Sequence, residues 1–307
     1  MKVKKFILVF LFVFLGFQLS AQATISRYPG SMFWKITGTD SKGQPSEIYV
    51  LGTIHVGDDR LFPLPDYIEE AWKSADKHVC EISSKEWSEL KGKLEKLMIK
   101  SANNTIKLKR NLKKELTEEE INYLYSLNPM YKMMMGFEPW VLNQVLTENL
   151  LEFSELQADK GYDNYFMNRA AEEGIELEGL DELQVQLDVL TFGDWDYQLN
   201  QVKQAIKELQ SGEAVEGIKN LYEAYLTFDE NEIAALSEIE SKPETSDNSD
   251  YNEFRDAVFL NRNSNWSEEI NNYLLNGGKT FIFAGCGHFV GDDSVFILMK
   301  NKGYLEF

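Results

Sequence analysis

The chain has 307 residues, of which 43% are hydrophobic, and a formal net charge of −19. This length is enough for one large domain with a sizeable core, or for two closely joined parts. The negative charge argues against binding to nucleic acid or to anionic membranes, because both depend on Lys and Arg side chains. We therefore expect no nucleic-acid partner.

Residues 1–21 have the pattern of a secretory signal peptide. Residues 1–5 are basic, residues 6–17 are almost wholly apolar, and residues 20–23 supply small side chains for cleavage. The apolar stretch is shorter than the ~20 residues that a spanning helix needs, although an uncleaved anchor is the alternative. We expect residues 22–307 to be exported to the periplasm or the extracellular space, with no stable membrane span after cleavage.

The remainder of the chain predicts an α/β fold. Short apolar, β-branched runs at 48–54, 78–82, 175–180 and 279–284 indicate strands. Helical segments lie between them, one opened by Pro65 and another running from Tyr162 to Glu173 before Gly174. Strands that alternate with helices predict a central mixed β-sheet with crossover helices.

The middle of the chain predicts a mainly helical insertion. Thr117 and Glu120 form a capping-box pattern that opens a helix through Leu127, and residues 199–225 follow helical spacing. The polar, turn-rich residues 241–250 predict a loop. The predicted divisions are an α/β core from about 30–85, 160–190 and 255–307, and an insertion from about 86–155 and 195–250.

Two of the three histidines stand in nearly the same local sequence. His55 lies in GTIHVGDD and His288 in GCGHFVGDD, and each follows a predicted strand. Imidazole is the commonest metal ligand and the usual acid–base group near neutral pH. We therefore predict one functional site that contains both, although a hydrogen-bonded histidine at a strand end is the alternative for either one alone.

The Asp pairs that follow each histidine have two interpretations. Their carboxylates would add oxygen ligands that favour a hard ion such as Mn²⁺. Asp pairs also occur in turns and as helix caps. The residues concerned are Asp58, Asp59, Asp292 and Asp293.

Glu81 is the third candidate, because it interrupts the apolar strand 78–82 near its carboxyl end. A carboxylate there is costly to desolvate unless it is paired or metal-bound. With His55 and His288 it would complete three protein ligands and leave a position for water or substrate, as catalytic metal sites require. Glu81 as a general base, or as a surface residue, is the alternative. His78 is three positions from Glu81 on the same predicted strand, so its side chain is expected on the opposite face of the sheet. We predict that His78 is structural.

Arg262 is the fourth candidate. Arg262 lies in a series of otherwise apolar residues that recur every four positions. If the region is a single helix, this spacing would place Arg262 on its inward face. An inward guanidinium needs an acidic partner, a substrate carboxylate or a developing oxyanion. The alternative is a helix broken near residues 261–265, with Arg262 exposed. The other members of the series are Phe254, Val258, Trp266 and Ile270.

The two cysteines, Cys80 and Cys286, each lie beside a candidate motif. In an oxidising compartment they could form one disulfide.

Together these motifs resemble the TraB/GumN family, which is related to the Tiki proteases. The resemblance implies an α/β core with a helical insertion and a site built from His55, His288, Glu81 and Arg262. Animal Tiki proteins are metal-dependent peptidases that use Mn²⁺ or Co²⁺. The chain departs from the family at Asp181, where Glu is common, and at Cys286, where a small residue is usual. The other matching segments are 64–65, 139–140, 161–163, 179–180, 186–187, 262–263 and 303–304.

The resulting hypothesis is an exported metal-dependent hydrolase that acts on a peptide or protein substrate. The predicted metal ligands are His55, His288 and Glu81, and Arg262 would hold substrate charge. Mn²⁺ or Co²⁺ is favoured by the resemblance, and Zn²⁺ is the third candidate. The first alternative is a non-catalytic periplasmic protein that binds a peptide or a metal. The second is metal-free acid–base hydrolysis by His55 and Glu81.

Overall fold

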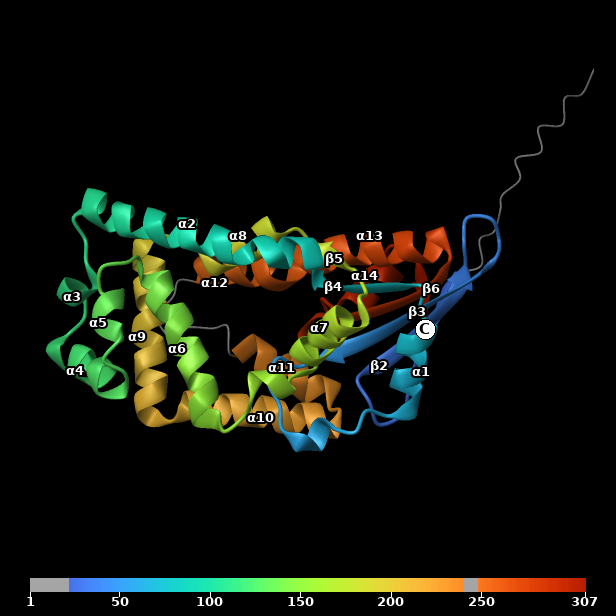
Figure 1. Cartoon of the computed structure of the whole chain (residues 1–307), viewed down its shortest axis with the longest axis horizontal. Coiled ribbons are helices and arrows are strands. Elements are labelled where there is room, and N and C mark those ends of the chain that lie inside the picture. The colour runs from blue at the N-terminus through green and yellow to red at the C-terminus, as the bar shows by residue number, and fades with distance from the viewer. Residues whose placement is uncertain (1–21, 240–247) are drawn as a thin grey trace, which may run out of the picture.

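The computed structural model describes residues 22–239 and 248–307 (Figure 1). The predicted signal peptide and most of the predicted loop at 241–250 lie outside these ranges. Within them, no helix combines the length and the apolar composition that crossing a membrane requires.

A seven-stranded mixed sheet forms the centre of the α/β part, in the order β5-β4-β6-β3-β2-β1-β7. β5, β4, β6 and β3 run parallel to one another, whereas β2 is antiparallel to both β1 and β3. The predicted α/β class with a mixed sheet is thus confirmed. The strands are β1 (Ala23–Arg27), β2 (Phe33–Thr39), β3 (Pro45–Thr53), β4 (Lys77–Ile82), β5 (Leu177–Asp181), β6 (Gly278–Gly285) and β7 (Leu305–Glu306).

The four predicted strands correspond to β3, β4, β5 and β6, which form the parallel half of the sheet. These strands are covered on both faces, so they appear in the sequence as continuous apolar runs. The sequence did not reveal β1, β2 and β7. β2 has Lys35 between its buried residues Trp34 and Ile36, and β7 has only two residues.

Helices cover both faces of the sheet. On one face, Trp72 of α1 (Asp66–Ser74) and Phe166 of α7 (Tyr162–Glu173) pack against Phe281 of β6. On the other, α13 (Asn261–Asn276) contacts β3 and β5, and it also packs against α14 (Val295–Asn301). Trp72, Phe166 and Phe281 are all fully buried, so the main core lies between the sheet and these layers.

Part of the helical region in the middle of the chain has a separate hydrophobic core. It includes Leu112, Tyr131, Leu142 and Val202, each completely buried. The capping box predicted at Thr117 is present. These helices project from one side of the sheet (Figure 1). Those that contribute to the separate core are α3 (Leu112–Glu115), α4 (Glu118–Leu127), α5 (Tyr131–Met134), α6 (Pro139–Ser154) and α9 (Trp195–Ser211). The other helices of this region are α2 (Ser84–Leu108), α8 (Leu183–Leu190), α10 (Glu213–Thr227), α11 (Glu230–Ile239) and α12 (Asn248–Arg255). Of these, α10 and α11 bury Tyr222, Tyr225 and Ile233 in the main core instead.

One close backbone crossing sets the position of α7 relative to β3. The amide of Tyr162 donates to the carbonyl oxygen of Ile54 at 3.0 Å, so the start of α7 lies directly on the chain that leaves β3. A Cβ atom on Gly161 would come within 2.3 Å of the backbone of His55. Only glycine fits there without displacing backbone.

We expect Gly161→Ala to lower the free energy of unfolding by roughly 2–4 kcal/mol, because rigid backbone atoms must move to admit the methyl group. Urea denaturation followed by circular dichroism would measure this loss. Gly92→Ala is the matched control, since Gly92 lies in α2 with open space around its Cα. That substitution is expected to stabilise the fold by up to about 1 kcal/mol. Equal stabilities of the two variants would contradict the proposed crossing.

Candidate functional site

His55, Glu81 and His288, three of the four candidate residues, gather with Asp181 at the carboxyl ends of the four parallel strands. Asp181 ends β5, Glu81 lies near the end of β4, and His288 and His55 follow β6 and β3. β3 and β6 are adjacent, with Thr53 opposite Gly285 in the register. The two matching histidine sequences therefore leave neighbouring strands at the same edge. This edge is where parallel sheets commonly gather ligand-binding groups.

Three candidate side chains face one point beside Gly285. A Cβ atom placed on this glycine would lie 3.3 Å from Oε1 of Glu81, 3.7 Å from Cδ2 of His288 and 4.0 Å from Nε2 of His55. The structure thus brings together the three residues that the sequence proposed as ligands. Gly285 leaves the space between them open.

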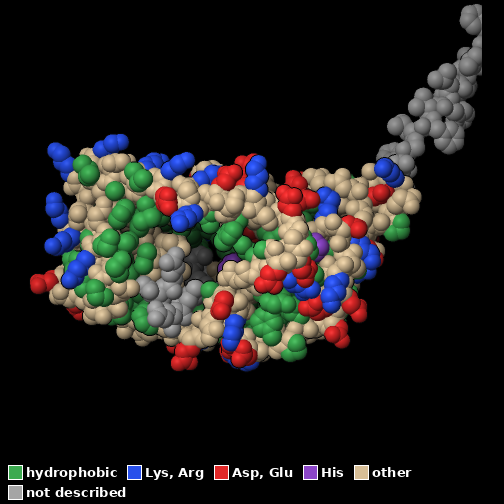
Figure 2. All heavy atoms as spheres, viewed as in Figure 1, with side chains coloured by type: hydrophobic (Ala, Val, Ile, Leu, Met, Phe, Trp, Pro, Cys, Tyr) green, Lys and Arg blue, Asp and Glu red, His purple; other side chains and the backbone are tan. Residues whose placement is uncertain are grey.

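His55 is held through its Nδ1 atom. This nitrogen lies 3.0 Å from Oδ2 of Asp163, and the hydroxyl of Thr53 donates to Oδ1 of the same carboxylate at 2.6 Å. The charge of Asp163 raises the pKa of His55 to about 9, against desolvation that lowers it. The side chain is nonetheless 72% exposed. Figure 2 shows a hollow in the middle of this face of the molecule, with a histidine side chain at its rim.

His288 is buried and is also held through Nδ1, which lies 2.6 Å from Oδ1 of Asn263. The amide of Asn263 donates to the carbonyl oxygen of Asp293, so its Oδ1 atom is the acceptor. His288 therefore carries its proton on Nδ1 and has its lone pair on Nε2. Burial, and then the charge of Arg262, lowers the pKa of His288 to about 3. The ring packs against Trp266 at a centroid distance of 4.2 Å.

Glu81 is fixed by three donors. The amide of Gly285 donates to Oε1 at 3.0 Å, and Oε2 accepts from Arg262 at 2.6 Å and from Gln186 at 3.1 Å. Burial opposes the charge of this carboxylate. The positive charge of Arg262 and the nearby imidazoles nevertheless hold the pKa of Glu81 well below its usual range. Glu81 is thus an anion at neutral pH.

Arg262 faces inward and joins two strands. Its Nε atom donates to Asp181 at 2.7 Å and its Nη2 atom to Glu81 at 2.6 Å, and only 7% of the side chain is exposed. The helix is continuous through this region rather than broken, although residues 256–260 (η3) form a π-helical turn between α12 and α13. Trp266, on the next turn, donates from its indole to Asp181 at 2.7 Å.

The donor set fits a divalent metal ion in its chemistry. Both imidazoles are anchored through Nδ1 to an oxygen atom, which is the usual outer-shell arrangement of metal-binding histidines. Neither Nε2 atom has a hydrogen-bond partner in the described residues. However, within 22–239 and 248–307 no three His, Cys, Asp or Glu side chains are already arranged to hold a metal. Metal binding therefore remains a proposal.

Three of the four Asp residues that follow the histidines are engaged elsewhere. Asp58 caps the short helix η1 (Asp59–Leu61) by accepting from the amide of Arg60, and Asp59 pairs with Lys160 at 2.6 Å. Asp293 contributes its backbone oxygen to Asn263, and its carboxylate lies 3.7 Å from Arg255. For these three residues the structure supports the alternative interpretation of caps and turns over that of metal ligands.

His78 and the two cysteines are structural. Nε2 of His78 lies 3.0 Å from the carbonyl oxygen of Trp72, on the α1 face of the sheet and away from Glu81. Cys80 and Cys286 are buried free thiols, so the disulfide considered from the sequence does not form. The Cys80 thiol donates to the carbonyl oxygen of Ile82 at 3.0 Å.

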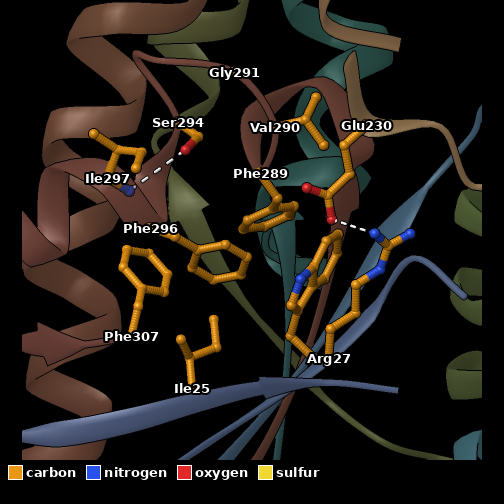
Figure 3. Close-up of a pocket in the computed structure, with 11 residues that line it drawn as sticks. Ile25, Arg27, Glu230, Phe289, Val290, Gly291, Ser294, Phe296, Ile297 and Phe307 are labelled. Carbon is orange, nitrogen blue, oxygen red and sulfur yellow. Dashed lines mark hydrogen bonds and ion pairs between the residues drawn. The ribbon is translucent and has the colours of Figure 1, made fainter. Parts of the chain in front are cut away.

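A separate pocket of about 470 Å³ contains none of the four candidate residues (Figure 3). Trp34, Phe289 and Phe296 form much of its wall. Arg27 points toward Glu230, with which it pairs at 2.6 Å, and also donates to the carbonyl oxygens of Ser31 and Phe228. Because these partners already engage its guanidinium, Arg27 is not available to an anionic ligand.

Sequence reasoning missed the residues that hold the four candidates in place. Asp163, Asn263 and Gln186 all occur in segments of the family resemblance, but nothing local to them indicated which candidate they contact. Asp181 was noted only as a departure from the family. Its position at the end of a predicted strand, like that of Glu81, was the available signal.

Comparison with known proteins gives two findings. The model of the TraB/PrgY/gumN family matches residues 32–306, a range that includes all four candidate residues. An uncharacterized protein of Treponema pallidum (strain Nichols) is 28% identical over 279 residues, which cover 90% of this chain and 82% of that protein. No solved structure matches the chain.

In protein treated with a chelator, we expect Asp163→Asn to lower the pKa of His55 from about 9 toward 6.5, because the neighbouring negative charge is removed. NMR titration of the imidazole would measure the change. The pair stabilises the folded state while His55 is protonated. Its contribution is therefore complete below about pH 6.5 and is lost as the pH rises through about 9. Identical titration curves for the variant and the parent protein would contradict this assignment.

We expect Arg262→Met to lower the free energy of unfolding by about 3–5 kcal/mol, because it leaves Glu81 and Asp181 without their buried counter-charge. Chemical denaturation at neutral pH would measure the loss. Arg60→Met is the control. It removes an arginine that is 50% exposed and pairs with Asp58 and Glu223, so about 1 kcal/mol or less is expected. Similar losses in both variants would show that Arg262 has no special structural role.

Proposed function

We propose that this chain, which belongs to the TraB/PrgY/gumN family, is a metal-dependent hydrolase that acts on peptides. The observation that carries the proposal is the approach of His55, His288 and Glu81 to one point beside Gly285. Each of the three is positioned by a partner of its own, and the site lies at the sheet edge where ligands commonly bind. The resemblance to the Tiki proteases favours a peptide substrate and Mn²⁺ or Co²⁺, with Zn²⁺ as the third candidate.

The proposed ligands are Nε2 of His55, Nε2 of His288 and Oε1 of Glu81. A bound divalent cation would supply Lewis-acid polarisation of a substrate carbonyl and would acidify a water molecule. The charges around the site are compatible with a divalent cation. Glu81, Asp163 and Asp181 contribute three carboxylates, and Arg262 is the guanidinium that pairs with two of them. With neutral histidines these four groups sum to −2.

The residues of the chain have distinct roles in this proposal. Asp163 and Asn263 hold the two imidazole rings through their Nδ1 atoms, which leaves both Nε2 atoms available to a metal ion. Arg262 acts as a positioning residue, because three of its N–H donors already bond to Glu81, Asp181 and the carbonyl oxygen of Val258, and only 7% of its side chain is exposed. We therefore revise the expectation that Arg262 holds substrate charge. Its role is to keep Glu81 ionised and oriented.

Metal-free hydrolysis is the second candidate, and one observation favours it. The pKa of His55 is raised to about 9 and that of His288 is lowered to about 3. At neutral pH one imidazole is then a cation and the other is neutral, which is the arrangement of an acid–base pair. The acid–base pair in this second candidate is His55 with His288. It takes the place of the predicted pair His55 with Glu81, because Glu81 is already paired with Arg262.

We also propose that the protein is exported, on the basis of the signal-peptide pattern of residues 1–21.

The test is elemental analysis of purified protein after loading with Mn²⁺, Co²⁺ or Zn²⁺. We expect one divalent ion per chain, and a loss of at least tenfold in affinity in the variant His55→Ala, His288→Ala. His78→Gln is the matched control, because it removes the third histidine, which lies on the opposite face. Thermal melting would establish that each variant is folded. A folded parent protein that binds none of these ions would refute the metal proposal.

Turnover of a peptide library separates the remaining functions. Cleavage that stops in chelator and resumes when the metal is restored supports the metal-dependent peptidase. Cleavage that continues in chelator supports acid–base catalysis by the two histidines. Metal or peptide binding without cleavage supports the non-catalytic binding protein.

A further inference from the structure

The charge of the chain is unevenly distributed. Residues 96–114 contain seven Lys or Arg and no Asp or Glu, although the whole chain has a net charge of −19. The rest of the chain therefore has a net charge of −26. This basic stretch covers the second half of α2, the turn after it and the start of α3. It lies at the end of the helical part that is farthest from the sheet (Figure 1).

The lysines of this stretch are free to meet an external partner. All six are exposed, and none forms an ion pair with the described residues. Arg110 differs, because it pairs with Glu115 and Asp196 and stacks over Trp195. The six are Lys96, Lys100, Lys107, Lys109, Lys113 and Lys114.

Exposed apolar side chains occur at the same end. Of the nine large hydrophobic side chains that are exposed in the described residues, five lie on α2 from residue 99 onward or around α5. The loop after α5 is fixed to α2, because Thr105 donates to the carbonyl oxygen of Gly136 at 2.9 Å. Figure 2 shows hydrophobic side chains interspersed with Lys and Arg at this end. The five, with exposures of 54–75%, are Ile99, Ile106, Leu108, Met130 and Met133.

We propose that this surface, here called the basic apolar tip, binds anionic lipid membranes. It consists of the six lysines and five hydrophobic side chains just named. Lysines beside a bilayer are attracted to anionic headgroups, and neighbouring aliphatic side chains enter the boundary between headgroups and acyl chains. The proposal concerns peripheral binding and does not depend on the hydrolase activity.

The composition of the tip favours a membrane over other anionic partners. Protein interfaces are depleted of Lys and enriched in aromatic residues, Met and Arg. The tip has six lysines, and none of its five exposed apolar side chains is aromatic. Nucleic acid would engage the lysines but would leave the five apolar side chains without a role. The rest of the surface is strongly acidic and would be repelled by the same membrane. Binding is therefore directed through the tip, although the net charge of the chain argues against anionic membranes in general.

The test is co-sedimentation of residues 22–307 with vesicles. These residues contain both hydrophobic cores and omit the apolar stretch near the N-terminus. The probes are phosphatidylcholine vesicles with and without about one-third phosphatidylglycerol, at low and high salt. We expect binding only to the anionic vesicles and weaker binding at high salt.

Two variants with matched controls examine the two components of the tip. Lys100, Lys107, Lys109 and Lys113 changed to Gln should weaken binding by at least about 100-fold, since each Lys contributes about fivefold. Its control changes Lys42, Lys73, Lys85 and Lys219 to Gln and should bind at least as well as the parent protein. Ile106→Ser with Met133→Ser should weaken the binding that persists at high salt, whereas Leu275→Ser with Phe307→Ser should not.

Three results would overturn the proposal. The first is a folded parent protein that does not sediment with anionic vesicles. The second is equal weakening by the tip variant and the control variant of the lysines. The third is binding to duplex DNA or to an acidic protein through these lysines, without binding to vesicles. Circular dichroism and thermal melting of each variant would establish that the fold is intact.

Discussion

The buried ion pairs of Arg262 are the interaction on which the candidate site depends. This single guanidinium joins the ends of two strands, through Asp181 on β5 and Glu81 on β4, to a helix that packs on the sheet. The carboxylates are costly to bury, and the guanidinium is equally costly without them. Each charge therefore requires the other two. The geometry of the strand edge follows from this requirement, and so does the ionised state of Glu81.

The two histidines of the site differ in their surroundings. Their local sequences match and their strands are neighbours, yet their environments are opposite. His55 lies at an exposed position beside a carboxylate, whereas His288 is buried beside a neutral amide and near Arg262. The repeated histidine motif therefore places two imidazoles at the same edge of the sheet. Their partners Asp163 and Asn263 are distant in the sequence, and the two rings have different pKa values. One histidine is thus paired with a carboxylate and the other with an amide. This arrangement is compatible with metal binding and also with metal-free acid–base catalysis.

The helical part adds a property that is separate from the site. Its own hydrophobic core lets it hold the basic apolar tip at a distance from the acidic remainder of the surface. The net charge sets the attraction or repulsion between the whole molecule and a distant partner. Once the two surfaces touch, the electrostatic interaction depends on the charges within about one Debye length, ~10 Å. At that distance six unpaired lysines outweigh the average composition. The expectation drawn from net charge holds for most of the surface and fails locally.

The sequence by itself determined the parallel half of the sheet and the four candidate residues. Strands buried on both faces need continuous apolar runs, and such runs are visible without a structure. Glycines beside histidines and a glutamate within a strand were equally local signals. Several features were decided only by the tertiary structure. β1, β2 and β7 gain their strand conformation from pairing, and their sequences carry no such run.

The partners of the site residues were also hidden. Asp163 is 110 positions from Thr53, and Arg262 is 181 positions from Glu81. Contacts at such separations leave no trace in local composition. The same reason explains the two cysteines, which lie beside candidate motifs but remain free. Sequence specified which residues had unusual chemistry. Folding decided what each of them touches, because protonation, orientation and ligand capacity depend on neighbours that the chain brings together only in space.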